Sequence, residues 1–226
     1  MSLTDSFVKD MERRILTGEW SYGDKIPSLR ELAAFYGVSR SVINAGIVEL
    51  QNKGYLLTVP RRRTVVSDWK RQGTLAVMNG LIDNELYNYE IISNLLESRM
   101  TIERASAVDA AERRTDEDLY YLKEVLSEEA RAVTIDERVQ ADVKFHHTVA
   151  VASHNIVYPL MLKSFEKIAV KLVTAFYQNN LDREFVYSRH NVIYNAIAEK
   201  NGFKAEEAMI TLLKQGEEII KRLYRK

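Results

Sequence analysis

One carboxylate and two imidazoles are the residues in this 226-residue chain whose types and spacing could bind a metal. Asp142 and His146 are four residues apart, so on a helix both side chains can face the same point. His190 lies on a later segment that is also predicted to be helical. Imidazole and carboxylate together suit zinc, nickel, manganese or iron. The same spacing also fits an ordinary acid–histidine pair, which is what we expect of His147 and His154.

A second group of polar residues could read DNA. Arg40, Ser41, Asn44 and Val48 fall about one turn apart on the outer face of a predicted helix. Arginine can bond guanine edges or phosphate, and asparagine can make a bidentate contact with adenine. The run Arg61-Arg62-Arg63 adds positive charge at the tip of a predicted hairpin. Single polar residues of these types are usually only solvated, so the interpretation depends on the elements around them.

Local signals place the arginine-bearing helix in a helix-turn-helix. Ser28 and Glu31 have the spacing of a capping box, and Gly37 is placed for a left-handed C-cap. Ser39, two residues later, can cap a further helix, which stops at Gly54. Two short helices joined by three residues have the pattern of a helix-turn-helix.

The flanking segments complete a winged helix. Phe7, Met11 and Ile15 recur at helical spacing and predict an earlier helix, which Gly18 ends. Segments 55–59 and 64–66 are rich in β-prone residues and flank the arginine run, which predicts a hairpin or wing. The chain thus has, in order, a helix, a capped helix, a turn, a further helix and a basic hairpin. This order favours a DNA-binding domain over a winged helix that does not bind DNA.

Glycine, proline and charge divide the chain in two. Six of the nine glycines and two of the three prolines lie before residue 74. Residues 1–72 carry 12 Lys and Arg against 8 Asp and Glu, and residues 73–226 carry 20 against 24, so the net charges are +4 and −4. We expect a winged-helix DNA-binding domain with its linker at 1–72 and an all-helical domain at 73–226, with the boundary in Ser67–Gly73.

Composition excludes several other classes. The chain has no cysteine, so disulfides and thiolate metal sites are excluded. No apolar run approaches the ~18 residues of a membrane helix, and the N-terminus lacks the pattern of a signal peptide. These features predict a soluble cytoplasmic protein. Helical periodicity from Leu75 onward predicts six or seven helices in an all-α bundle, so the fold class is mostly α.

The front half resembles the GntR family of bacterial transcription regulators. The resemblance lies in segment 23–33, GDKIPSLRELA, and segment 37–40, GVSR. It implies a sequence-specific regulator that binds double-stranded operator DNA through Arg30 and Arg40 and dimerises through a C-terminal ligand domain. Ser39, next to Arg40, is a further candidate for DNA contact. Asn44 stands where the family usually has an arginine, and the arginine run stands where it usually has a glycine.

The back half resembles the FCD ligand domain, which accompanies the FadR subgroup of that family. The matching residues are Glu97-Ser98-Arg99 with Glu103, segment 142–146, segment 153–155, and His190 six residues before Ala196. The resemblance implies an organic acid effector on a divalent metal, such as zinc, nickel or manganese, held by one aspartate and three histidines. Asp142, His146 and His190 match three of these ligands, and Leu212 occupies the place of the fourth.

Two further residues enter the effector site through this resemblance. Arg99 lies in a largely apolar helix, and a guanidinium can grip a carboxylate through two parallel hydrogen bonds. The alternative is an ion pair with Glu97 or Glu103. The family register favours the carboxylate clamp and also places Asn155 among the effector-binding residues.

Other functions compete with a metal-dependent sensor. One is a regulator that binds an acyl-CoA-type effector without metal, as the FadR branch implies. Another is a hydrolytic enzyme in which Asp142, His146 and His190 hold a metal that activates water. A third is an adaptor whose helical bundle binds another protein. We favour a regulator that is not an enzyme, because the chain has a complete DNA reader and no obvious general base beside the metal ligands.

Overall fold

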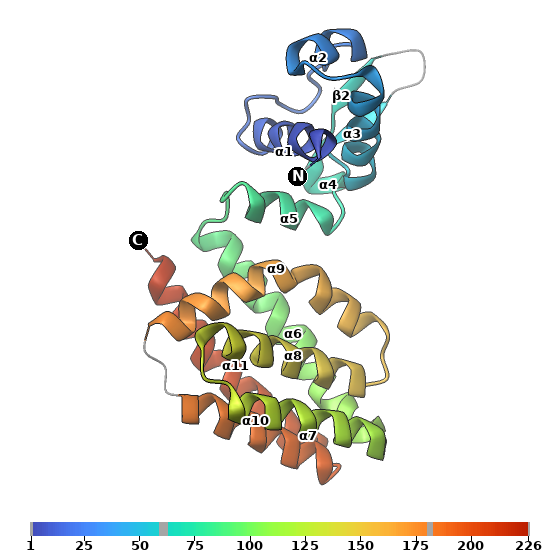
Figure 1. Ribbon diagram of the computed structural model, residues 1–226. Coiled ribbons are helices and arrows are strands. Elements are labelled where there is room, and N and C mark those ends of the chain that lie inside the picture. The colour runs from blue at the N-terminus through green and yellow to red at the C-terminus, as the bar shows by residue number, and fades with distance from the viewer. Residues whose placement is uncertain (1, 59–62, 180–182, 226) are drawn as a thin grey trace. The chain divides into compact units, whose positions relative to one another are not determined.

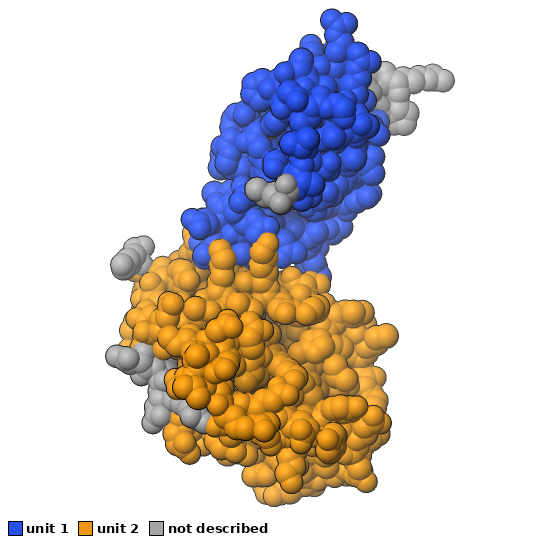
Figure 2. All heavy atoms as spheres, viewed as in Figure 1, with its two compact units in different colours: residues 1–87 blue, residues 88–226 orange. Residues whose placement is uncertain are grey.

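The computed structural model describes residues 2–58, 63–179 and 183–225, which form eleven helices and two short strands (Figure 1). Contacts between residues divide the chain into two compact units, residues 1–87 and residues 88–226 (Figure 2). The mostly α fold class is confirmed, with a winged helix-turn-helix in the first unit and helices alone in the second. Among the described residues, no helix is long and apolar enough to cross a membrane.

The first unit contains the elements expected of a winged helix. Its first five elements are α1 (Leu3–Leu16), α2 (Leu29–Tyr36), α3 (Arg40–Lys53), β1 (Leu56–Thr58) and β2 (Thr64–Val66). The two strands pair antiparallel, with Leu56 opposite Val66 and Thr58 opposite Thr64. This pairing confirms the predicted hairpin, although Pro60, Arg61 and Arg62 of its tip lie outside the described residues.

The predicted caps fix the turn between α2 and α3. The Ser28 amide donates to Glu31 at 2.7 Å, and the Ser28 hydroxyl accepts from the Glu31 amide at 3.4 Å. Gly37 ends α2 with φ 65°, a left-handed conformation that favours glycine. Ser39 then accepts from the Val42 amide at 3.3 Å and begins α3. The capping box, the glycine cap and the serine cap are therefore confirmed.

A close approach of two helices sets the core of this unit. Phe7 and Met11 of α1 and Ile43 of α3 are fully buried. Gly46 lies on α3 against α1, and a Cβ added there would lie 2.4 Å from Cδ1 of Phe7. A larger residue at Gly46 would therefore push the two helices apart, and α3 would lose its fixed position on α1.

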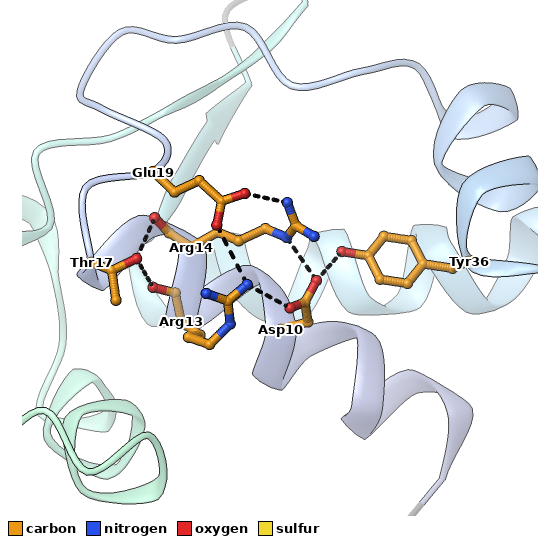
Figure 3. Close-up of polar contacts among 6 residues, drawn as sticks. All are labelled: Asp10, Arg13, Arg14, Thr17, Glu19 and Tyr36. Carbon is orange, nitrogen blue, oxygen red and sulfur yellow. Dashed lines mark hydrogen bonds and ion pairs between the residues drawn. The ribbon is translucent and has the colours of Figure 1, made fainter.

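A polar network ties α1 to α2 (Figure 3). Asp10 accepts from the Tyr36 hydroxyl at 2.6 Å, from Nε of Arg14 at 2.8 Å and from Nη2 of Arg13 at 3.1 Å. Glu19 forms ion pairs with both arginines. Partial burial alone would raise the pKa of the Asp10 carboxyl, but the hydrogen bonds from Tyr36, Arg14 and Arg13 lower it overall. The charged carboxylate thus holds α2 in place beside α1.

The segment predicted as a linker belongs to the first unit. Residues 69–72 form a short helix, α4 (Trp69–Gln72), and α5 (Ala76–Asp83) follows. The Ser67 amide donates to the Tyr55 carbonyl at 2.9 Å, and the Thr74 amide donates to the Lys53 carbonyl at 3.0 Å. These backbone bonds attach the segment to the end of α3 and to the wing, so the two units divide after Tyr87 rather than within Ser67–Gly73.

The second unit is a bundle built around one long helix. Its elements are α6 (Tyr89–Arg113), α7 (Asp116–Arg131), α8 (Ile135–Ala152), α9 (Val157–Gln178), α10 (Arg183–Ala198) and α11 (Gly202–Tyr224). Helix α6 packs against α8, α9, α10 and α11, and α8 lies between α7 and α9 (Figure 1). The core includes Ala107, Leu122, Phe145, Ile193 and Met209, all fully buried. This packing brings polar residues of α6, α7, α8 and α10 together.

Candidate functional site

The outer face of α3 carries the predicted DNA-reading residues. Arg40, Ser41, Asn44 and Val48 are all exposed. Ser39 is exposed as well, but its hydroxyl is occupied as the cap of α3 and lies 2.8 Å from the Ser41 hydroxyl. The face therefore presents a guanidinium and a carboxamide one turn apart, with the side-chain types that read base edges in a major groove.

Two further predicted DNA contacts lie outside α3. Arg30 is exposed in the first turn of α2, and Arg63 is exposed just before β2. Arg61 and Arg62 lie outside the described residues. The described part of the first unit therefore leaves its predicted DNA-contacting arginines accessible, as binding to a polyanion requires.

The three predicted metal ligands come together in the second unit. Asp142 and His146 project from α8 and His190 projects from α10, and one potential ligand atom from each lies within 4.8 Å of the others. Oδ1 of Asp142 is 3.8 Å from Nε2 of His146. All three side chains are buried, and the His146 and His190 rings have centroids 5.2 Å apart. Neutral imidazoles and a carboxylate at these separations can bind one divalent cation.

Each of the two histidines is backed by a glutamate. The Glu129 carboxylate of α7 lies 2.9 and 3.0 Å from Nδ1 of His190, and Nδ1 of His146 is within ion-pair distance of Glu103 on α6. A carboxylate on one ring nitrogen orients the ring and makes the other nitrogen a better metal ligand. Sequence reasoning gave Glu129 no role, because no helical spacing connects it to His190.

The remaining nitrogen of His190 lacks a partner. Its Nε2 is buried and forms no hydrogen bond within the described part of the chain. A buried polar atom without a partner costs about 1–3 kcal/mol, so an atom of this kind calls for a ligand that the protein itself does not supply. His190 also belongs to the cluster with His146 and Asp142, so a bound cation is a ligand that fits this nitrogen.

Asp142 is oriented by a tyrosine of α9. The Tyr177 hydroxyl donates to Oδ2 of Asp142 at 3.3 Å. Burial raises the pKa of Tyr177, and the nearby charge of Asp142 raises it further, so the phenol stays protonated and remains a donor. This bond occupies Oδ2 and leaves Oδ1 on the side of His146.

Arg99 forms the ion pair that was one of its two predicted roles. Its Nε donates to Glu103 one turn along α6, and the same glutamate contacts His146. Burial alone would raise the pKa of Glu103, but the charge of Arg99 and the contact with His146 outweigh that effect and hold it at about 2. Because the bond uses Nε, the terminal nitrogens of Arg99 are not committed to it.

A small cavity adjoins the donor atoms. It has a volume of about 40 Å³, and Arg99, Asp142, His146 and Leu212 are among its lining residues. Leu212 of α11 thus stands on the wall of the donor site, where the family resemblance implies a fourth ligand. An isobutyl group has no donor atom, so the protein offers three ligands there.

Asn155 does not reach this site. It precedes α9, and its side-chain oxygen accepts from the Val157 amide at 3.1 Å. It is not among the described residues that line the cavity beside the donors. Its amide therefore stabilises the start of α9, and its place among the effector-binding residues stays a prediction.

Family models match both units. The model "Bacterial regulatory proteins, gntR family" matches residues 3–66, and the model "FCD domain" matches residues 94–215. The first match spans the winged helix, and the second contains Arg99, Asp142, His146 and His190. The two matches agree with the division of the chain into a DNA-reading unit and a helical unit.

Individual proteins resemble the chain over nearly its whole length. It is 27% identical over 213 residues to the HTH-type transcriptional regulator LutR of Bacillus subtilis (strain 168), and the alignment covers 91% of this chain and 95% of LutR. It is 26% identical over 223 residues to the HTH-type transcriptional repressor NanR of Klebsiella aerogenes, and the alignment covers 94% of this chain and 83% of NanR. Relatives of this kind are transcriptional regulators and not enzymes.

Solved structures share the fold. A Streptococcus agalactiae GntR structure has a TM-score of 0.53 at 26% identity, covering 94% of this chain and 99% of its own. Lar, which controls the expression of the Listeria monocytogenes agr system, has a TM-score of 0.67 at 18% identity, covering 99% and 98%, and supports the fold alone. This chain therefore belongs to the GntR family, as a DNA-binding transcriptional regulator whose second unit is an FCD effector-binding domain.

Proposed function

We propose that this regulator binds its operator as a homodimer and that a small organic acid, bound at a divalent metal in the FCD domain, changes its affinity for DNA. The observation that carries the proposal is the convergence of Asp142, His146 and His190, with a buried ring nitrogen of His190 that has no partner in the described residues. A regulator of bacterial genes works where the chromosome lies, so we place it in the cytoplasm.

Asp142, His146 and His190 would hold the metal. Two imidazoles and one carboxylate suit zinc, nickel or manganese, and Glu103 and Glu129 would orient the two rings. A metal held by these three residues would supply positive charge and could bind an oxygen of the effector. Leu212 in place of a fourth ligand makes this site weaker than a four-ligand site.

Arg99 would recognise the carboxylate of the effector. It lines the cavity beside the donors. Burial lowers the pKa of Arg99, but the negative charges of Glu103 and Asp142 raise it by more, so the guanidinium stays charged. A charge-assisted hydrogen bond to a carboxylate is roughly twice as strong as a neutral one. This makes an acid a better ligand for the cavity than the matching alcohol or amide.

Dimerisation follows from the size of the DNA reader. One winged helix presents a single reading helix and reaches one half-site, whereas a dimer joins two half-sites about one helical turn or a multiple of it apart. Arg30, Arg40 and Arg63 would contact phosphate or guanine, and Asn44 would read a base. An effector that binds better to one placement of the two reading helices would shift operator affinity.

Native mass spectrometry of the full chain tests the metal and the dimer together. We expect a dimer that carries up to one Zn²⁺ per subunit after incubation with ZnCl₂. His146→Ala should lose the bound Zn²⁺, whereas His154→Ala should keep it, because His154 is a half-exposed partner of Asp118 on another part of the bundle. Zinc bound equally to both variants would contradict the metal site, and a monomer at micromolar concentration would contradict the dimer.

A further inference from the structure

A second and much larger cavity lies beside the donor site. It has a volume of about 700 Å³ and is lined mainly by α6, α8 and α9. Leu96, Arg99, His146 and Val173 line both this cavity and the small one. Arg99 and His146 are therefore the polar residues at the border between the metal donors and the large cavity.

Volume decides which cavity can hold an effector. A cavity needs a volume of roughly 10–15 Å³ to hold one water molecule. The small cavity, at about 40 Å³, therefore has room for a few waters or for a carboxylate group. Ligand sites for drug-sized molecules occupy about 300–1,000 Å³, and the large cavity, at about 700 Å³, falls in that range. The large cavity shares Arg99 and His146 with the small one, so it is the space available to the rest of an effector that contacts these residues.

The walls of the large cavity favour an apolar body. Leu95, Leu162, Phe165 and Leu172 are among its lining residues, and all four are buried or partly buried. Burying apolar ligand surface against such walls stabilises the complex by about 25 cal/mol per Å² of surface removed from water. The binding free energy of a hydrocarbon body in this cavity should therefore become more favourable in proportion to its length.

The charged lining residues of this cavity are mostly paired with each other. Nζ of Lys144 lies 2.6 Å from Glu128, and Lys163 forms an ion pair with Glu166. Arg131 is exposed, and its Nε donates to the Ser127 carbonyl at 3.0 Å. Arg99 is paired as well, with Glu103, but it differs from these cations because it is partly buried and lies at the border with the donor site.

We infer that the effector is a monocarboxylate with an extended apolar body, whose carboxylate lies at Arg99 and His146 and whose body fills the large cavity. The inference rests on the proposed function for the carboxylate and adds the chemical class of the rest of the molecule. Acids of two to four carbons would leave most of this cavity filled with water. Their binding would forgo the apolar contacts that the cavity offers.

Calorimetric titration of the zinc-loaded full chain with butyrate, octanoate and 1-octanol tests the inference. Each buried methylene should tighten binding about fourfold, so octanoate should bind up to about 200-fold more tightly than butyrate. Octanol should bind more weakly than octanoate, because it cannot form charge-assisted bonds with Arg99. Equal affinities for butyrate and octanoate would overturn the inference, and octanol that binds as well as octanoate would do the same.

A cavity-filling variant locates the apolar body. Ala169 of α9 lines the large cavity and not the small one, so Ala169→Phe should weaken octanoate binding at least tenfold and leave butyrate binding unchanged. Leu160→Phe is the matched control, because Leu160 is exposed on the same helix and lines neither cavity. Octanoate affinity unchanged in a folded Ala169→Phe variant would contradict this placement, and the chain-length series decides if that variant does not fold.

The acid sensor and the apolar body of its effector can be tested separately. If butyrate binds and loses affinity in Arg99→Lys, but octanoate binds no better, the acid sensor stands and the apolar body is wrong. If no carboxylate of the series binds to the zinc-loaded protein, the proposed acid sensor itself is wrong, and with it the inference.

Discussion

Glu129 holds His190 through one ring nitrogen: both carboxylate oxygens of Glu129 lie about 3 Å from Nδ1 of the ring, at 2.9 and 3.0 Å. Phe145 stacks on the same ring at a centroid distance of 4.0 Å. The ring is therefore fixed in position, and the carboxylate favours a proton on Nδ1, which leaves Nε2 as the nitrogen available to a metal. A histidine prepared in this way binds a metal without first reorganising.

Glu129→Gln should weaken zinc binding about 10–100-fold. Glutamine keeps the size of the side chain but removes the negative charge that makes His190 a better metal ligand. Competition of the protein with a chromophoric chelator measures the zinc affinity. Glu128→Gln is the control, because Glu128 is exposed and pairs with Lys144. Equal zinc affinities of the two variants would show that Glu129 does not act through His190.

Leu212→His should raise metal affinity. Leu212 lines the same small cavity as Asp142 and His146, so an imidazole there can complete a four-ligand shell. The variant should retain more zinc than the wild-type protein after gel filtration, measured by elemental analysis. Leu213→His, at the next position of the same cavity wall, is the comparison. No gain from Leu212→His over that variant would count against the ligand register.

Acid should destabilise the second unit through Glu103. The folded pKa of this carboxyl is about 2 against an ordinary value of 4.5, so its stabilisation is present above about pH 4.5 and is lost as the pH falls toward 2. The loss amounts to at most about 3 kcal/mol. Glu103→Gln should be less stable at pH 7 and should lose less stability across this window. Urea unfolding at several pH values measures both effects, and parallel pH profiles would exclude the prediction.

Asn44→Ala should relax the preference for one base pair in each half-site by about 1–3 kcal/mol, if Asn44 reads that base. Arg40→Ala should weaken binding to the whole operator. Fluorescence anisotropy on a set of single-base operator variants separates the two results. A uniform loss across all variants for Asn44→Ala would show that this residue reads no base.

The first unit could be predicted from sequence because its signals are local. Ser28 with Glu31, Gly37 and Ser39 each act within about one turn of backbone, so their roles are visible without the fold. The helix of residues 69–72 was missed because four residues are too few to show helical periodicity. Backbone bonds to Tyr55 and Lys53, which are distant in sequence, place it with the first unit.

The candidate metal site was only partly visible in the sequence. Asp142 and His146 share a helix turn, but His190 comes from α10, and no spacing in the sequence connects it to them. Glu129 could not be identified at all, because the packing of α7 against α10 brings it to His190. Asn155 carried a family role in the prediction, and its side chain forms a hydrogen bond at the start of α9.

The central claim is that acid binding in the FCD domain changes operator binding by the winged helix. The direct measurement is the operator affinity of the zinc-loaded full chain by fluorescence anisotropy, with and without saturating carboxylates of two to twelve carbons. At least one acid should shift the dissociation constant by about 5–150-fold, a range typical of allosteric coupling. The shift should disappear in His146→Ala and persist in His154→Ala. A dissociation constant that no acid changes, in protein shown to contain zinc, would contradict the account.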